Sequence, residues 1–158
     1  EVDRYRRGMY TFFKRTAPHP NLITFDCPDA NLTCVDRSKS NTPLQALVAL
    51  NNESFTEAAQ AFAKRILESS STSDVNANLV SAFRICVARP PSERDVIVLA
   101  ELLESSRRWY ADHLDEAKAL VGKLPASGIN VQENVQENAA WIVTLRVLMN
   151  LDEFITRE

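Results

Sequence analysis

The residues best suited to chemistry in this chain of 158 residues lie near its start, in a stretch without a helical pattern. Asp26 and Asp29 stand in TFDCPD, and two carboxylates can serve as general acid and general base when burial separates their pKa values. The same stretch is typical of a turn in which each aspartate bonds a nearby backbone amide, and we favour that interpretation. Together with the surrounding cations and one amide they form a candidate polar cluster: Lys14, Arg15, Asp26, Asp29, Arg37 and Asn41.

Basic and aromatic side chains alternate before this stretch, from Arg4 to Arg15. Such alternation occurs in sites for phosphate, sulfate or stacked bases. It is also typical of an amphipathic helix with its cations in water and its apolar side chains in the core, here Met9, Tyr10, Phe12 and Phe13. We favour the helix. The net charge of −3 does not predict nucleic acid as a partner.

Few other residues can support catalysis or bind a metal. The chain has two histidines, three glycines and three cysteines, and it lacks the motifs of nucleophilic hydrolases, zinc sites and phosphate-binding glycine loops. We therefore predict no catalytic, cofactor or metal site in this chain. Cys27 and Cys34 allow either a short disulfide or two free thiols. Cys86 lies in an apolar helical pattern and is predicted to be a buried thiol.

Composition predicts one folded domain over residues 1–158. Hydrophobic residues make up 45% and charged residues 25%, which is ordinary globular usage, and the length suffices for one sizeable core. No apolar run reaches the ~18 residues that cross a bilayer, so we predict no membrane insertion.

Helix start signals recur along the chain and decide the fold class. Thr42 and Gln45 predict a capping box with Pro43 at the first helical position, and Asn51 and Asn52 predict its end. Further capping boxes are predicted from the pairs Ser54 with Glu57 and Ser92 with Asp95.

Apolar residues at helical spacing then predict helices over residues 43–50, 54–69, 79–89, 93–121 and from 137 onward, the last interrupted near residues 150–152. Only residues 22–25 and 32–35 alternate as strands do, and both segments are short. The predicted fold is all-α, a bundle of four to five helices with a long irregular segment, residues 16–40, packed on it. Long irregular segments are often functional.

Six segments carry a resemblance to a known family: RRGMYTFFKRTAPHP, TFDCPD, SNTPLQALVALNN, FTEAAQAFAKRIL, AFRICVARPPSERD and AAWIVTLRVLMNLDEFITRE. In order and wording they resemble the C-terminal domain of planctomycete-type multidomain proteins, catalogued as domain of unknown function 1553. The resemblance implies that this chain is the C-terminal part of a longer, extracytoplasmic protein. Upstream domains of the same polypeptide and other proteins would be its partners, and one upstream domain would be cytochrome c-like, with haem.

The family carries over no catalytic role, only candidate positions. Family members have Cys at the position of Cys34 and a small residue at that of Cys27, so a disulfide between the two would be peculiar to this chain. The polar positions that match the family are Arg7, Lys14, Arg15, Asp26, Asp29, Arg37, Asn41, Gln45, Asn51, Asn150, Asp152 and Glu153.

Three functions are open at this point. The favoured one is a non-catalytic docking module that uses residues 1–40 as its contact surface and exposes apolar side chains between Tyr5 and Phe13. In the second, Asp26, Asp29 and Arg37 complete a redox or polysaccharide-related enzyme site whose other half lies upstream. The third is binding of an anionic polysaccharide through the early cations.

Overall fold

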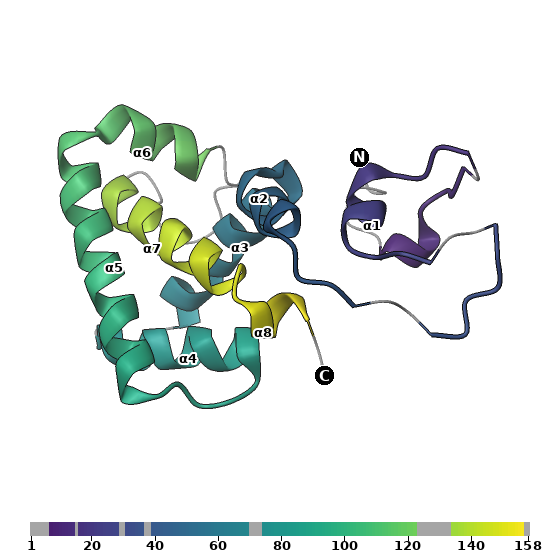
Figure 1. The fold of residues 1–158 in the computed structure, drawn as a ribbon. Helices are drawn as coiled ribbons and strands as arrows, with labels where there is room; N and C mark the ends of the chain where they lie inside the picture. The colour runs from purple at the N-terminus through teal and green to yellow at the C-terminus, as the bar shows by residue number, and fades with distance from the viewer. Residues whose placement is uncertain are drawn as a thin grey trace. The chain divides into compact units, whose positions relative to one another are not determined.

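The computed structural model describes residues 7–14, 16–28, 31–36, 39–69, 74–122 and 134–156. The chain forms two compact units, one up to Val48 and one from Ala49 onward, which we describe separately. All regular structure in the described ranges is helical, so the predicted all-α class is confirmed (Figure 1). The single domain over residues 1–158 and the packing of residues 16–40 on the bundle stay predictions, because both concern the relation between the units.

The second unit is the helical bundle. Helix α2, Pro43–Asn51, leads into it across the boundary between the units. Its other helices are α3 (Glu53–Ser69), α4 (Val75–Val87), α5 (Glu93–Asp112), α6 (Leu114–Val121), α7 (Val135–Leu148) and α8 (Asp152–Ile155). Helix α7 is central, because it packs on α3, α5 and α6, and Figure 1 shows it in yellow in the middle of this unit.

Apolar residues around the whole circumference of α7 explain this central position, since a helix that is apolar on all sides is stable only when it is buried on all sides. Its buried residues are Ala139, Ala140, Trp141, Ile142, Thr144, Leu145 and Leu148. The surrounding helices each contribute one apolar face, with Ile66 from α3, Phe83 from α4 and Leu103 from α5. These residues form the one continuous core of the second unit.

Two of the three predicted capping boxes are confirmed. At the start of α2, the Thr42 amide donates to Gln45 Oε1 (2.9 Å) and the Gln45 amide donates to Thr42 Oγ1 (3.2 Å). At the start of α5, Ser92 and Asp95 exchange bonds of 2.9 and 3.2 Å in the same manner.

The third predicted box, Ser54 with Glu57, is wrong. Helix α3 begins at Glu53, and Asn52 Oδ1 accepts from the Ser54 amide at 2.9 Å. Asn52 is the single residue between α2 and α3, so the asparagine that ends one helix also caps the next.

The predicted continuous helix from residue 93 to 121 is also wrong, because it breaks at His113. His113 has φ −129° and ψ 59°, and its Nδ1 donates to the Trp109 carbonyl at 2.7 Å. That carbonyl is the one which the His113 amide would use in an unbroken helix. The imidazole also stacks on the Trp109 ring, with 4.1 Å between centroids. The side chain therefore takes over a backbone bond, and α5 and α6 form separately.

The other predicted boundaries agree with the structure where it describes them. Helix α4 ends at Ala88, whose φ of 59° is left-handed, just before Pro90. The predicted interruption near residues 150–152 separates α7 from α8. Most of the predicted loop at residues 122–130 lies outside the described residues.

The first unit corrects two further predictions. Residues 8–10 form a short 3-10 turn, η2 (Gly8–Tyr10), followed by extended chain, in place of the predicted amphipathic helix. Glycine and the aromatic and β-branched residues after it are poor helix formers. Residues 22–25, one of the two short strand-like segments, belong largely to helix α1 (Pro20–Thr24), because Pro20 suits the first helical turn and His19 Nδ1 accepts from the Asn21 amide at 3.3 Å.

We expect Leu103→Ala to lower the free energy of unfolding by about 2–5 kcal/mol, since Leu103 is fully buried and the cavity left behind cannot collapse completely. Denaturant unfolding followed by circular dichroism measures the change. The control is Ile97→Ala on the same helix, where the side chain is 57% exposed and the loss should stay below about 1 kcal/mol. Equal losses in the two variants would contradict the assignment of the core.

Candidate functional site

Of the predicted cluster residues that the structure describes, Asp26 lies in a polar network with residues outside the predicted cluster. Lys14 and Asn41 are exposed. Arg15, Asp29 and Arg37 lie outside the described residues, so the predicted carboxylate pair and the convergence of all six residues stay predictions.

The network surrounds Gln45, which is buried with 0% exposure although it is polar. Its Nε2 donates to the Thr24 carbonyl (2.8 Å) and to Ser40 Oγ (3.0 Å), and it lies 3.2 Å from Asp26 Oδ2. Its Oε1 accepts from the Thr42 amide. We call these five residues the Gln45 cluster: Thr24, Asp26, Ser40, Thr42 and Gln45.

Asp26 is the second anchor of the Gln45 cluster. Its Oδ2 accepts from the Ser40 amide at 2.8 Å and from the Ser40 hydroxyl at 2.7 Å. Asp26 follows α1 with a left-handed φ of 55°, a conformation that aspartate tolerates better than most residues. The predicted turn is therefore present, and the carboxylate bonds an amide fourteen residues away in the chain.

This geometry gives Asp26 a structural role. One carboxylate oxygen receives three donors, and bonds of this kind hold a carboxylate in a fixed position. The cluster joins residue 24 to residue 45 and thereby closes the irregular segment between α1 and α2. The sequence predicted the capping bond of Gln45, but the partners at 24 and 26 are too distant in the chain for a local pattern to indicate them, and Ser40 lies outside the capping motif.

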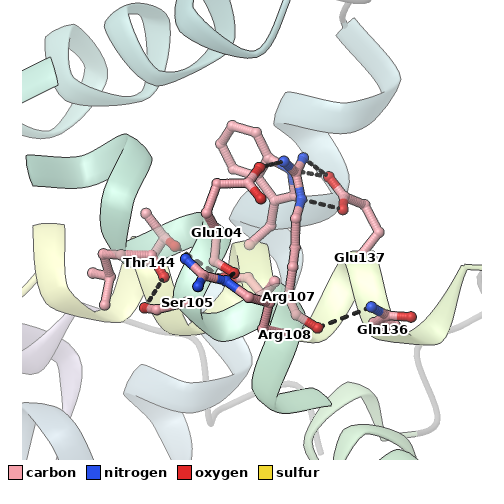
Figure 2. Close-up of polar contacts among 10 residues, drawn as sticks. Glu104, Ser105, Arg107, Arg108, Gln136, Glu137 and Thr144 are labelled. Atoms are coloured by element: carbon pink, nitrogen blue, oxygen red, sulfur yellow. Dashed lines mark hydrogen bonds and ion pairs between the residues drawn. The ribbon is translucent and has the colours of Figure 1, made fainter. Parts of the chain in front are cut away.

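A second polar cluster, missed by the sequence interpretation, lies between α5 and α7 (Figure 2). Arg107 donates to both carboxylate oxygens of Glu137, through Nε (2.7 Å) and Nη2 (2.5 Å), and Nη1 donates to Glu104. Glu137 also accepts from Trp141 Nε1 at 2.8 Å, and Gln136 donates to the Arg107 carbonyl at 2.9 Å. The bonds to Glu137 and Glu104 raise the pKa of the Arg107 guanidinium.

A third cluster joins two of the segments that resemble the family. Arg89, in ARPPSERD, donates to both oxygens of Glu153, in NLDEF, at 2.6 Å each. Its Nη1 lies 3.5 Å from Asp95 Oδ2, and its guanidinium carbon lies 4.9 Å from the centre of the Phe83 ring. Bonds from Ser92 and then from Arg89 lower the pKa of Asp95, and the Arg89 bonds lower that of Glu153.

All three cysteines are free thiols, which decides between the two alternatives for Cys27 and Cys34. Cys34 is exposed, and Cys27 and Cys86 are half-buried. Cys86 packs against the core, less deeply than predicted, and burial raises the pKa of its thiol to about 11. It therefore stays protonated, and so unreactive, near neutral pH.

Within the described ranges, no three metal-ligating side chains come together. No helix of the described chain combines the length and the apolar composition of a membrane span. Among the described residues, the three polar clusters join segments that are distant in the chain.

Comparison with known proteins places the chain in a family. A family model named PSD1 and described as a protein of unknown function (DUF1553) matches residues 1–103. The chain belongs to the DUF1553 family. The matched range contains the whole Gln45 cluster, whereas Glu137 and Glu153 lie beyond it. No curated protein and no solved structure matches this DUF1553 chain.

We expect Gln45→Glu to open the first unit of the DUF1553 chain. The variant keeps the size and one acceptor, but it loses the two donated bonds and sets a second negative charge beside Asp26. A lost bond that leaves buried partners unpaired costs about 1–3 kcal/mol, so hydrogen exchange of the Ser40 amide should accelerate by at least about tenfold.

The matched control is Gln60→Glu, which removes a bond to the Leu120 carbonyl in the second unit and should leave Ser40 exchange unchanged. Slow Ser40 exchange in both variants would show that Gln45 does not hold the cluster.

We expect the third cluster to weaken in acid. Because the folded-state pKa values of Asp95 and Glu153 are lowered, the unfolded chain binds protons more readily. Their stabilisation is complete above about pH 4–5 and is lost as pH falls through the folded values. Arg89→Gln should therefore reduce the drop in melting temperature between neutral pH and pH 3. Arg84→Gln, at an exposed arginine of the preceding helix α4, is the control, and parallel curves for all three proteins would refute the role of Arg89.

Proposed function

We propose that this DUF1553 chain is a non-catalytic interaction module whose first unit docks on other domains of its own polypeptide. An uncharacterised helical module is what the fold and the family establish. The docking role rests on the surface of the first unit.

Exposed apolar side chains carry the proposal. Met9, Tyr10 and Phe12 are 76%, 66% and 86% exposed, and the same unit exposes Ile23, Leu32 and Val35. Single exposed apolar residues are ordinary, but several large ones within thirty residues are typical of a surface that is covered by a partner. Aromatic residues and methionine are also the types enriched at protein interfaces.

The interior of the first unit supports the same conclusion. In its described part, Gln45 is the one buried side chain, so polar bonds organise the interior of this unit while many of its large apolar residues are exposed. The Gln45 cluster fixes the chain between residues 24 and 45, which lowers the entropy that docking must overcome.

The geometry of Asp26 favours docking over a composite enzyme site. A general base needs a carboxylate that is free to take a proton from the substrate, whereas Asp26 is engaged by Ser40 and Gln45. Because Ser40 and Gln45 hold the Asp26 carboxylate in place, Asp26 contributes to a rigid surface on which a partner can dock.

Family resemblance alone supports two extensions of this proposal. The first is an extracytoplasmic location. The second is that the docking partners are the upstream domains, among them a cytochrome c-like domain that would carry haem.

The experiment compares the chain alone with the chain joined to its native upstream domains. We expect amide exchange over residues 7–36 to slow in the longer protein, and Phe12→Ser to cancel that protection while changing the stability of the chain alone by less than about 0.5 kcal/mol. The matched control is Ile97→Ser, which removes a side chain of similar kind that is exposed on the second unit. Exchange rates that are the same with and without the upstream domains would overturn the proposal.

A further inference from the structure

Arg146 differs from the other arginines that the structure describes. Arg107 and Arg146 are half-buried, and the others in the described ranges are exposed, where water can solvate them. Arg107 is neutralised by Glu137. Arg146 projects from α7, the central helix, and forms no ion pair with a described carboxylate.

Two polar atoms at this end of α7 are shielded from solvent and lack a hydrogen-bond partner in the described chain: Arg146 Nε and Asn150 Oδ1. The two residues are four apart, and the Asn150 amide still donates to the Val147 carbonyl at 3.0 Å, so their side chains leave the same side of the helix end. A buried donor or acceptor without a partner costs about 1–3 kcal/mol, and more when it is charged. Buried polar atoms in folded proteins are generally satisfied by protein groups or ordered water, so an atom without a protein partner calls for a bound group from outside the chain, a water or an ion.

The chemistry of the two side chains indicates what that group is. A guanidinium binds an oxyanion through parallel N–H groups, and Arg89 and Arg107 both bind a carboxylate in this manner. The Asn150 side chain makes no bond in the described structure, so its amide is free to turn and present Nδ2 as a further donor.

We propose that Arg146 and Asn150 form a binding site for a compact oxyanion, a carboxylate or a phosphate group. A water molecule would satisfy Nε but would leave the partly buried positive charge without a counter-ion. The charge also acts on the interior, because it lowers the pKa of Tyr110, which burial raises. This site lies in the second unit and is independent of the docking proposal.

The test follows the Nε–Hε resonance of Arg146 in nitrogen–proton spectra of the whole chain, with the resonance assigned by its loss in Arg146→Lys. Sodium phosphate, sodium acetate and sodium chloride are added at matched ionic strength. We expect a saturable shift with an oxyanion and none with chloride. Preference for acetate indicates a carboxylate as the natural ligand, and preference for phosphate indicates a phosphate group. Equal responses to all three salts would overturn the proposal.

Asn150→Asp provides the matched variant. It has the same size and places a carboxylate beside Arg146, so affinity for the added oxyanion should fall by at least about tenfold. The control, Asn134→Asp, adds the same charge at the other end of α7 and should keep the affinity. Unchanged affinity in Asn150→Asp would also overturn the proposal, and the wild-type titration decides by itself if that variant does not fold.

Discussion

The burial of α7 on every side is the constraint on which the second unit depends. A helix whose side chains are apolar around the full circumference cannot remain at a surface, so other helices must enclose it. Helices α3, α5 and α6 do so, and each then needs only one apolar face of its own. The ion pair of α7 lies at its end, where Arg107 meets Glu137 at the first turn, and the buried Thr144 hydroxyl bonds the Ala140 carbonyl of its own helix. The apolar interior thus determines where polar contacts can form.

The two units are held by different forces. The second has a continuous apolar core, whereas the first is organised around a buried amide and a carboxylate. The free energy gained by burying apolar surface is summed over many residues, so the second unit tolerates small changes in single side chains. A polar cluster depends on each member, because an unpaired buried donor is costly. The first unit, which is organised around such a polar cluster, keeps its exposed apolar side chains available for contacts with other surfaces.

Local patterns in the sequence predicted the elements that depend on local interactions. The capping boxes at Thr42 and Ser92 and the helix end before Pro90 need only neighbours along the chain, and the sequence predicted them. The break at His113 was not predictable, because it depends on the side-chain orientation that lets the imidazole take the Trp109 carbonyl. The Gln45 cluster was predicted only at its capping bond, since Gln45 also contacts Thr24 and Asp26, twenty-one and nineteen positions away, and Ser40, which lies outside the capping motif. Of the candidate cluster, Asp26 anchors the Gln45 cluster, a contact that the sequence did not indicate.

The two members of the Arg107–Glu137 ion pair differ in how many contacts depend on each of them. Its carboxylate accepts from Arg107 on the neighbouring helix and from the indole of Trp141 one turn further along α7. Loss of the arginine would leave the acid still engaged by the indole. Loss of the acid would leave the guanidinium with Glu104 alone and would strand a buried indole N–H, so position 137 is the less replaceable of the two. Glu137 thereby ties the orientation of the largest core side chain to a charge at the molecular rim.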